Sequence, residues 1–301
     1  MRVDRPLERW FARAAGALLL ISGTGLGAAV CGASGGAAGA ILGLAGSLAL
    51  ARLLSRRSDS RRRLLEAPFP AEWRRFLERR CDHYLRLPPE LRARFQDDLR
   101  IFLSEKRITG IEVTVTEELR LLVGCSAVTL SLGWPEYEWD QLTEVLLYPQ
   151  EFDRDYRVSA RGEDHRAGEA HPWGTLILSV PALLDSFADA GDGYHVGLHE
   201  FAHLLDVDQT HFDGIPVGLD SRRSRYWVSL AEREMARLRR RKSVLDPYGE
   251  DDPVEFLAVA IEAFFEIPLA MRRRHRELYD LLAEYFGQDP AHWDERRGLT
   301  D

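Results

Sequence analysis

Cysteine is scarce in this chain of 301 residues. The three cysteines, Cys31, Cys81 and Cys125, are widely separated, and none belongs to a C-x-x-C pair. This number and spacing argue against the disulfide framework of small secreted domains and against a metal site built from paired thiolates. The cysteine usage instead fits a protein of a reducing compartment.

Charged residues are absent from the 38-residue stretch Ala14 to Ala51, which is rich in Ala, Gly and Leu. A single membrane span needs about 20 residues, so this length suits nearly two spans, with the turn at "CGASGG". We predict a transmembrane hairpin with helices at about 14–31 and 37–54. The stretch is too long for the apolar core of a secretory signal. A buried helical hairpin of a soluble protein is the alternative.

Arginines flank this uncharged stretch on both sides. Residues 1–63 carry 10 arginines and 3 acidic residues, a net charge of +7, so the remaining 238 residues carry −15 of the total of −8. Positive residues favour the cytoplasmic side of a membrane, so a hairpin with both ends inside fits both clusters. We therefore predict a hairpin and linker over 1–63, and a body over 64–301 that faces the cytoplasm from the cytoplasmic membrane. The acidic body argues against a nucleic-acid partner.

The body combines helical and strand patterns, which indicates an α+β fold. Helical periodicity covers 71–108, with a break at Pro88-Pro89, and most of the C-terminal third. The β-branched content predicts strands at 110–115 and 143–149, and alternation predicts a third at 174–181. An exposed edge on this third strand could hold a peptide substrate in extended form.

Two further segments of the body are less regular. The apolar segment 119–134 could be a buried helix, which periodicity alone does not decide. The polar segment from Gln150 to His171 is predicted to be a loop or flap near the site.

The most informative motif is His-Glu-x-x-His at "HEFAH". On a helix, His199 and His203 are separated by one turn and point the same way, so one ion can bind both. Zinc accepts such nitrogen ligands, and a catalytic site keeps one position for water. Glu200 can then take a proton from water that the metal has made more acidic. The apolar spacer Phe201-Ala202 favours a buried helix over a chance match.

The motif does not fix a third metal ligand. An extended motif would place it at Gln209, which is a poor ligand, and would place a glycine where this chain has Asp206. Two acidic residues in the apolar segment "DPVEFLAVAIEAFFE", Glu255 and Glu262, are seven residues apart and share one helix face. Unpaired carboxylates would be costly there. Helical geometry alone does not rank the two.

A family resemblance ranks them. The segment "HEFAHLLD", followed some fifty residues later by "YGEDDPVEFLAVAIEAFF", resembles the Mlc titration factor A family of zinc peptidases over roughly residues 80–290. The resemblance implies a zincin-like fold with a metal site similar to that of the anthrax lethal factor catalytic domain. It implies Glu255 as the third zinc ligand and Tyr248 as a donor to the oxyanion. The family often has Ala where this chain has Val254.

The remaining polar candidates are given supporting roles. We expect Glu262 to orient a ligand histidine, and Asp206 either to fix a ligand tautomer or to be solvated on the helix surface. His195 is expected to be a neighbour of the ligands, because a fourth protein ligand would close the site. The other six histidines are predicted to lie on the surface: His83, His165, His171, His211, His275 and His292.

These expectations lead to two functions. The first is a membrane-tethered, cytoplasm-facing zinc metallopeptidase that hydrolyses peptide bonds, with Glu200 as general base. The second, which the resemblance implies, is a regulatory binding protein that sequesters a transcriptional repressor with little or no hydrolysis. The resemblance suggests at most an aminopeptidase acting on small substrates.

Overall fold

The computed structural model describes residues 6–153, 155–157, 166–208 and 211–299, and many side chains before residue 37 lie outside this description. The chain divides into two compact units at the junction of Pro68 and Phe69. We describe the N-terminal unit and the body separately.

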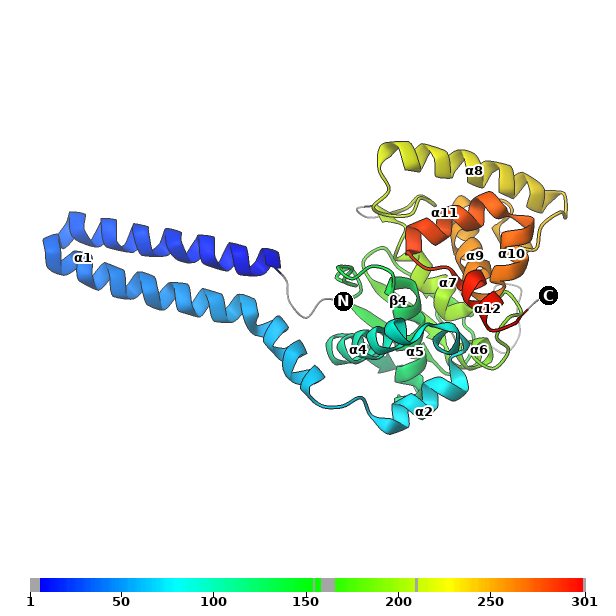
Figure 1. Ribbon diagram of the computed structural model, residues 1–301, viewed down its shortest axis with the longest axis horizontal. Helices are drawn as coiled ribbons and strands as arrows, with labels where there is room; N and C mark the ends of the chain where they lie inside the picture. The colour runs from blue at the N-terminus through cyan, green and yellow to red at the C-terminus, as the bar shows by residue number, and fades with distance from the viewer. Residues whose placement is uncertain (1–5, 154, 158–165, 209–210, 300–301) are drawn as a thin grey trace. The chain divides into compact units, whose positions relative to one another are not determined.

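The N-terminal unit contains α1, whose bounds are Pro6–Glu66. Figure 1 shows its ribbon doubling back as two antiparallel arms. The predicted bounds of 14–31 and 37–54 stay a prediction. Among the described residues no single helix has the length and apolarity of a membrane span, whereas Ala37–Leu53 and Ser55–Glu66, bent by 46°, pass that test together.

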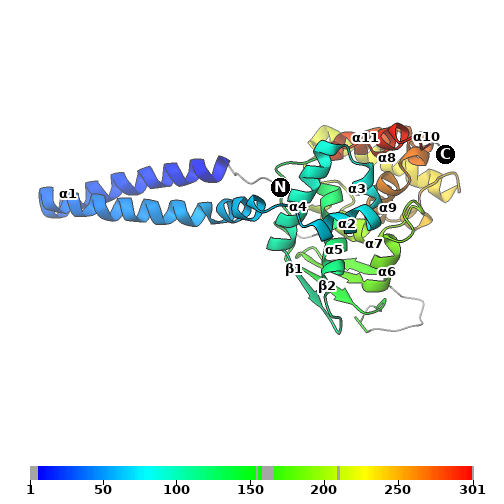
Figure 2. The same ribbon diagram turned by 60° about the horizontal axis from the view of Figure 1, so that its bottom comes forward.

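The body is a small mixed sheet with helices packed against one of its faces (Figures 1 and 2). Its strands are β1 Arg107–Gly110, β2 Glu144–Tyr148, β3 Gly168–Ala170, β4 Thr175–Ser179, and the short pair β5 Val207–Asp208 and β6 His211–Phe212. Its helices are α2 Ala71–Arg80, α3 Asp82–Arg86, α4 Pro89–Glu105, α5 Glu117–Ser131, α6 Val180–Ser186, α7 Val196–His203, α8 Ser221–Arg239, the 3-10 helix η1 Pro247–Gly249, α9 Pro253–Glu266, α10 Pro268–Arg274, α11 Arg276–Phe286 and α12 Pro290–Arg296. The predicted α+β class is confirmed for this unit.

The main sheet has the strand order β1-β2-β4-β3, with β1, β2 and β4 parallel and β3 antiparallel to β4. Val145 and Leu147 of β2 are buried and pair with Leu176 and Leu178 of β4, which are also buried. Alternate residues of a strand share one face, so these four make the inner, apolar face. The strand predicted at 143–149 is confirmed.

The strand predicted at 110–115 is wrong in position. The sheet contains Arg107–Gly110, and the chain turns away directly afterwards. A Cβ at Gly110 would lie 2.0 Å from the carbonyl oxygen of Val113, and Glu112 has a φ of 56°. The turn therefore requires a glycine and a left-handed residue, which end the strand in spite of the β-branched residues that follow.

The predicted sheet edge at 174–181 is also wrong. β4 pairs with β2 on one side and with β3 on the other, so the edge strand is β3. β3 lies in the polar segment that the sequence assigns to a loop. Its three residues are too few to show the alternation by which strands are identified.

Two glycines bring the central helices together. The segment left open in the sequence forms the buried helix α5. A Cβ at Gly124 of α5 would lie 2.4 Å from Leu99 Cδ1 of α4, and one at Gly197 of α7 would lie 2.2 Å from Ser126 Oγ of α5. Larger residues at these positions would push the helices apart. α7 therefore packs closely against α5, and it also contacts α9 and the strands β3 and β4.

Candidate metal centre

The first part of the site is the short helix α7. His195 precedes it, and its Nδ1 accepts a hydrogen bond from the Leu198 N–H at 3.2 Å, which satisfies one free donor of the first turn. His199, Glu200 and His203 lie on this helix and are all buried. His195 is therefore the cap of the helix that presents the motif.

The second part of the site is α9, which crosses α7. Asp252 caps this helix by accepting from the Val254 N–H at 2.8 Å, and Pro253 occupies its first position. Glu255 in the first turn has its Oε2 3.0 Å from His199 Nε2 and 3.7 Å from His203 Nε2. Two turns later, Glu262 Oε1 lies 2.7 Å from His199 Nδ1.

The donor atoms of His199, His203 and Glu255 lie within 4.8 Å of one another. Zinc ligands sit about 2 Å from the ion, so ligands of one ion are roughly 3–4 Å apart, as the Glu255 contacts are. Glu262 lies behind this group. Its other oxygen accepts the His195 N–H at 2.6 Å, so one carboxylate ties the start of α7 to the His199 ring.

The protonation of the three donors suits a cation. Burial lowers the pKa of His203 to about 3, so its ring is neutral. Burial opposes ionisation of Glu255, but the neighbouring imidazoles bring the pKa of that carboxyl below its usual value. Burial alone would lower the pKa of His199, yet Glu262 and Glu255 raise that pKa well above its ordinary value. One proton on His199 balances only one of the two carboxylate charges, whereas a divalent metal ion in place of that proton would balance both.

Glu200 lies beside these donors and is held in a tight space. It is buried, and burial raises the pKa of its carboxyl to about 8, with the Glu255 and Glu262 carboxylates adding to the increase and His199 opposing it. A Cβ at Gly168 of β3 would lie 2.4 Å from Glu200 Cγ and 2.6 Å from its Oε1. The edge strand therefore passes directly against this carboxyl group.

Tyr248 reaches the same space from η1. The Asp246 carboxylate accepts the Tyr248 N–H at 2.8 Å and so fixes the turn. The Tyr248 ring centroid lies 6.0 Å from that of His199, and 65% of the residue is exposed. Burial raises the pKa of its hydroxyl, and Glu255 and Glu200 add to that increase, so Tyr248 is a neutral donor at ordinary pH.

All these groups line one cleft of about 620 Å³. Its walls also carry Glu151, Glu169 and Asp246, and Arg166 is the one arginine or lysine among the described lining residues. The sequence did not single out β3 or the Arg166–Glu169 ion pair, whose atoms are 2.7 Å apart. Their only signal in the sequence is a polar segment rich in charges.

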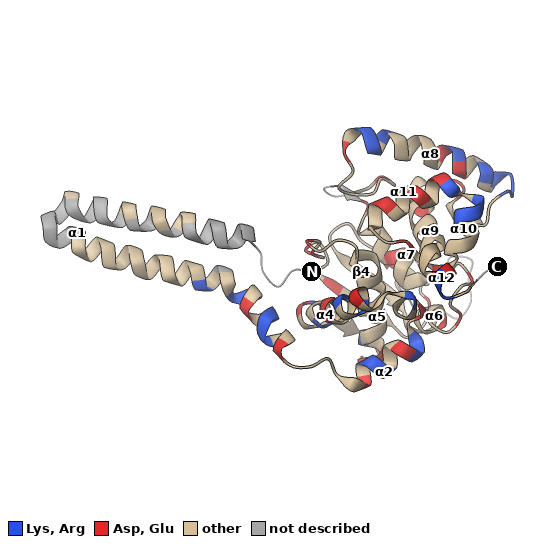
Figure 3. Ribbon diagram, viewed as in Figure 1, with Lys and Arg blue, Asp and Glu red and all other residues tan. Residues whose placement is uncertain are grey.

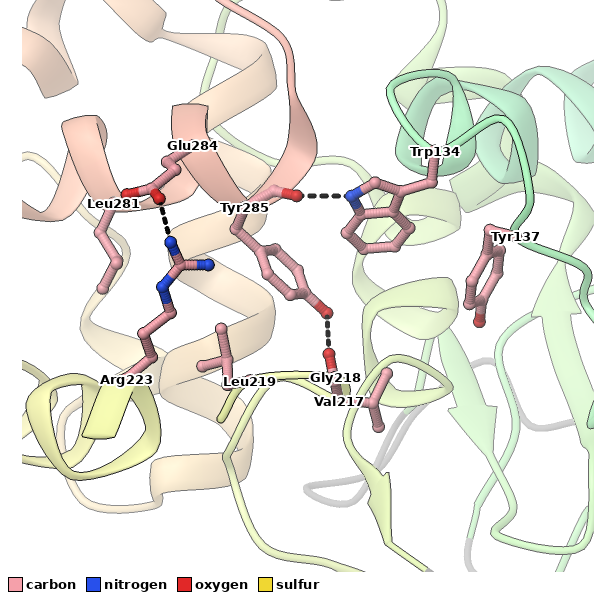
Figure 4. Close-up of a pocket in the computed structure, with 9 residues that line it drawn as sticks. All are labelled: Trp134, Tyr137, Val217, Gly218, Leu219, Arg223, Leu281, Glu284 and Tyr285. Carbon is pink, nitrogen blue, oxygen red and sulfur yellow. Dashed lines mark hydrogen bonds and ion pairs between the residues drawn. The ribbon is translucent and has the colours of Figure 1, made fainter. Parts of the chain in front are cut away.

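A second cavity, of about 390 Å³, shares no lining residue with this cleft. Figure 4 shows Trp134 and Tyr285 close together in it, with the Trp134 Nε1–H donating to the Tyr285 carbonyl, and the Arg223–Glu284 ion pair on the side of α8 and α11. It contains neither histidine nor cysteine, so a metal is not expected there.

Asp206 has neither of its two predicted roles, because it is fully buried instead of solvated and its carboxylate bonds to a loop instead of a ligand histidine. Its Oδ1 accepts the backbone N–H groups of Asp213, Gly214 and Ile215 at 3.1, 2.8 and 3.1 Å. Three donors from one loop outcompete a single imidazole. His203 Nδ1 has no hydrogen-bond partner among the described residues. Asp206 therefore holds the loop that follows α7.

Two of the six histidines predicted on the surface are buried. His83 packs edge-on against Phe265 with ring centroids 5.2 Å apart, and burial lowers its pKa to about 3. His275 is buried with its Nδ1 2.6 Å from Glu234 Oε2. His211 and His292 are exposed, His171 is half-buried, and His165 lies outside the described residues.

One helix presents two imidazoles and a carboxyl group to the cleft, and a second helix completes the donor set. This arrangement is typical of a metallopeptidase-type domain. Comparison with known proteins is in agreement. The chain belongs to the family of glucose-regulated metallo-peptidase M90, whose model matches residues 55–287.

Individual relatives support this membership. An uncharacterized protein of Synechocystis sp. is 32% identical over 247 residues, which cover 76% of this chain and 88% of that protein. Proteins named Mlc titration factor A from Pectobacterium atrosepticum and Klebsiella pneumoniae are 27% and 28% identical over 206 and 218 residues. These matches cover 63% and 66% of this chain and 76% and 80% of the relatives.

Proposed function

We propose that this protein is a zinc-dependent peptidase tethered to the cytoplasmic membrane, with its body in the cytoplasm. The observation that carries the hydrolytic part is the meeting of His199, His203 and Glu255 within 4.8 Å at a cleft that also contains Glu200. Membership of a metallopeptidase family supports the same reading.

The donor set fits zinc. Two imidazoles and one carboxylate are typical ligands of a catalytic zinc site that keeps an open position. The Glu255 and Glu262 carboxylates also favour a cation, because a single proton on His199, which lies between them, balances only one of their two charges. When bound, zinc would act as a Lewis acid toward a peptide carbonyl and toward water.

The other residues have roles that follow from their positions. Glu200 receives a proton from the attacking water and passes it to the leaving amine, as a general base and then acid does. The Tyr248 hydroxyl donates to the developing oxyanion. Glu262 accepts from His199 Nδ1 and so keeps Nε2 directed at the metal position. Among the described residues no strand pairs with β3 on the side away from β4, so this edge offers main-chain groups to an extended peptide.

The membrane tether rests on the sequence of α1. A stretch without charges is flanked by arginines, and Figure 3 shows basic residues gathering toward the C-terminal end of this helix. Arginines on both flanks favour a hairpin whose two ends face the cytoplasm. A reporter that is active only outside the cytoplasm, fused after Asp301, should be silent. Activity of this reporter would contradict the orientation.

The test of the hydrolytic function uses the full-length protein in detergent. We expect about one zinc per chain and cleavage of a casein-derived peptide mixture. Glu200→Gln should keep the zinc and lose cleavage by about 10²- to 10⁴-fold, because the ligands remain and the base is gone. Glu232→Gln, an exposed glutamate on α8, is the matched control and should behave as wild type. A wild type with zinc and no cleavage would contradict the proposal.

A second candidate function comes from the names of the relatives. These relatives carry the name Mlc titration factor A, and the family resemblance implies a protein that sequesters a transcriptional repressor, which a cytoplasmic body could do. Co-purification of a DNA-binding protein with Glu200→Gln, in the absence of cleavage by wild type, would favour this function.

A further inference from the structure

Three rings form a row where β3 turns into β4. The His171 and Trp173 rings are stacked, with centroids 4.4 Å apart and planes within 10°. The Tyr156 ring lies 6.1 Å from His171, and its hydroxyl is 3.2 Å from His171 Nε2. Trp173 is 70% exposed and Tyr156 is 40% exposed. We call Tyr156, His171 and Trp173 the aromatic row.

The turn itself does not require a tryptophan. It closes through hydrogen bonds from His171 N to Thr175 O at 2.8 Å and from Gly174 N to His171 O at 2.9 Å. Only Gly174, with a φ of 93°, needs a special residue. Leaving a large apolar ring in water forgoes its burial, whereas tryptophan is favoured where a partner covers it. The exposed ring therefore points to recognition.

The aromatic row continues the edge of the cleft. Ala167 and His171 both form hydrogen bonds with β4. The Ala167 carbonyl accepts the Ser179 N–H at 2.8 Å, and the His171 N–H donates to the Thr175 carbonyl at 2.8 Å. Because hydrogen bonding alternates along an antiparallel strand, the main-chain groups of Gly168 and Ala170 point to the free edge. Gly168 lies against Glu200, so a peptide paired with this edge runs from the reacting centre toward the row.

Side chains also alternate between the faces of a strand. Gly168 faces Glu200 on the inner face, so the side chains of Glu169 and His171 start from the other face of the strand, and the Glu169 carboxylate reaches the wall of the cleft, where it pairs with Arg166. The Tyr156 hydroxyl donates to Glu169 Oε1 at 3.3 Å, which places Tyr156 on that same outer face. Alternate side chains of a bound peptide would lie there beside them, close enough for cross-strand contact.

We propose that the aromatic row is a subsite for an aromatic or large apolar side chain of a peptide substrate, on the N-terminal side of the cleaved bond. The proposal rests on the proposed peptidase function. A peptide antiparallel to β3 has its N-terminal part next to the C-terminal end of the strand. At about 3.3 Å per residue, the row lies beside the residue roughly three to four positions before the cleaved bond. Such a subsite favours extended chains that are cleaved away from their N-terminus, and not the small aminopeptidase substrates that the family resemblance suggests.

The first test measures cleavage by the zinc-loaded full-length protein. Two fluorogenic peptides differ only by Trp or Ala at the fourth position before the cleaved bond. We expect kcat/KM to be roughly 5- to 10-fold higher for the Trp peptide, the range that one stacked aromatic pair gives, with the difference mainly in KM. In Trp173→Ala the ratio should fall to about one, and Trp173→Phe should restore most of it. Tyr226→Ala, which removes a 42% exposed tyrosine on α8, should keep the wild-type ratio.

The second test separates this proposal from the proposed function. Binding of the same two peptides to Glu200→Gln is measured by fluorescence anisotropy, which needs no cleavage. A preference for the Trp peptide that disappears in the Glu200→Gln, Trp173→Ala double variant supports the subsite, even if wild type cleaves neither peptide and the peptidase function falls. Equal binding of both peptides, or a preference that survives Trp173→Ala, overturns the subsite.

Discussion

Two buried histidines of the body, His199 and His275, each have a glutamate carboxylate at Nδ1, at 2.7 Å from Glu262 and 2.6 Å from Glu234. Their other ring nitrogens differ. His199 Nε2 faces the cleft beside Glu255, whereas His275 Nε2 lies 3.1 Å from Ser243 Oγ and accepts the Val244 N–H at 3.3 Å. The same pair of side chains thus lies beside the candidate metal site in one place and holds a loop in the other.

A histidine with a glutamate carboxylate at Nδ1 therefore does not by itself define a metal site. The orienting carboxylate is common to both, and what matters is the group offered to the second nitrogen. At His275 that group is a backbone donor, which leaves no room for an ion. At His199 it is a carboxylate with a second imidazole beyond it.

The largest expected contrast comes from removing each ring. His199→Ala should abolish zinc retention and cleavage, because the two protein ligands that remain bind zinc too weakly to retain it. His275→Ala should keep zinc in the folded protein but lower the free energy of unfolding by about 2–4 kcal/mol, because Glu234 and the Val244 N–H lose a buried partner. Metal analysis and urea unfolding of both variants check this. Loss of zinc in folded His275→Ala would remove the distinction.

The next effect is expected at Tyr248. Tyr248→Phe keeps the ring near His199 but removes the hydroxyl, so kcat should fall by about 10²- to 10³-fold, the usual cost of one oxyanion donor. KM should change little, because the hydroxyl acts mainly in the transition state. Steady-state kinetics on one peptide measure both. A fall of less than threefold in kcat would assign Tyr248 to packing.

A smaller effect should follow from neutralising the two orienting carboxylates. Glu262→Gln should weaken zinc binding by about 10- to 100-fold, because the carboxylate that raises the basicity of His199 is lost. Glu234→Gln is the matched variant and should leave zinc affinity as it is. Competition with a fluorescent chelator gives both values. Equal zinc affinity in the two variants would count against the role of Glu262.

The smallest effect concerns Glu266, the next glutamate of α9, which has no histidine partner among the described residues. It accepts the Gly191 N–H at 2.7 Å, and burial raises the pKa of its carboxyl from 4.5 to about 7. The protonated form is favoured on folding, so this group's contribution to stability is complete below pH 4.5 and is lost as the pH rises through 7. Glu266→Gln should therefore gain stability relative to wild type at pH 8 compared with pH 5, by on the order of 1–3 kcal/mol. Thermal unfolding at the two pH values tests the sign.

Much of the site could be predicted because it is local. The spacing of His199, Glu200 and His203 is set by the helical period, and the apolar residues around Glu255 and Glu262 predict a buried helix with two costly carboxylates. The resemblance, rather than periodicity, separated the roles of those carboxylates. Which carboxylate faces the metal position depends on where α9 crosses α7. This crossing is a long-range contact, and no short sequence pattern contains it.

The parts that could not be predicted also have physical reasons. β3 is too short to show a period, so its sequence predicts a loop where the sheet has its edge. β1 ends early because of the turn at Gly110. Asp206 is taken by a loop seven to nine residues further on. His275 was assigned to the surface because its partner, Glu234, lies 41 positions away in the sequence.

Gly168 makes the proposed general base and the proposed substrate-binding edge mechanically inseparable. The strand and the Glu200 carboxyl group occupy adjoining space with no allowance for a methyl group. A single added carbon at that position is therefore an internal wedge: Gly168→Ala would displace the carboxyl group while leaving every metal donor unaltered. The proposed chemistry could therefore be silenced without a change to any of the groups to which it is assigned.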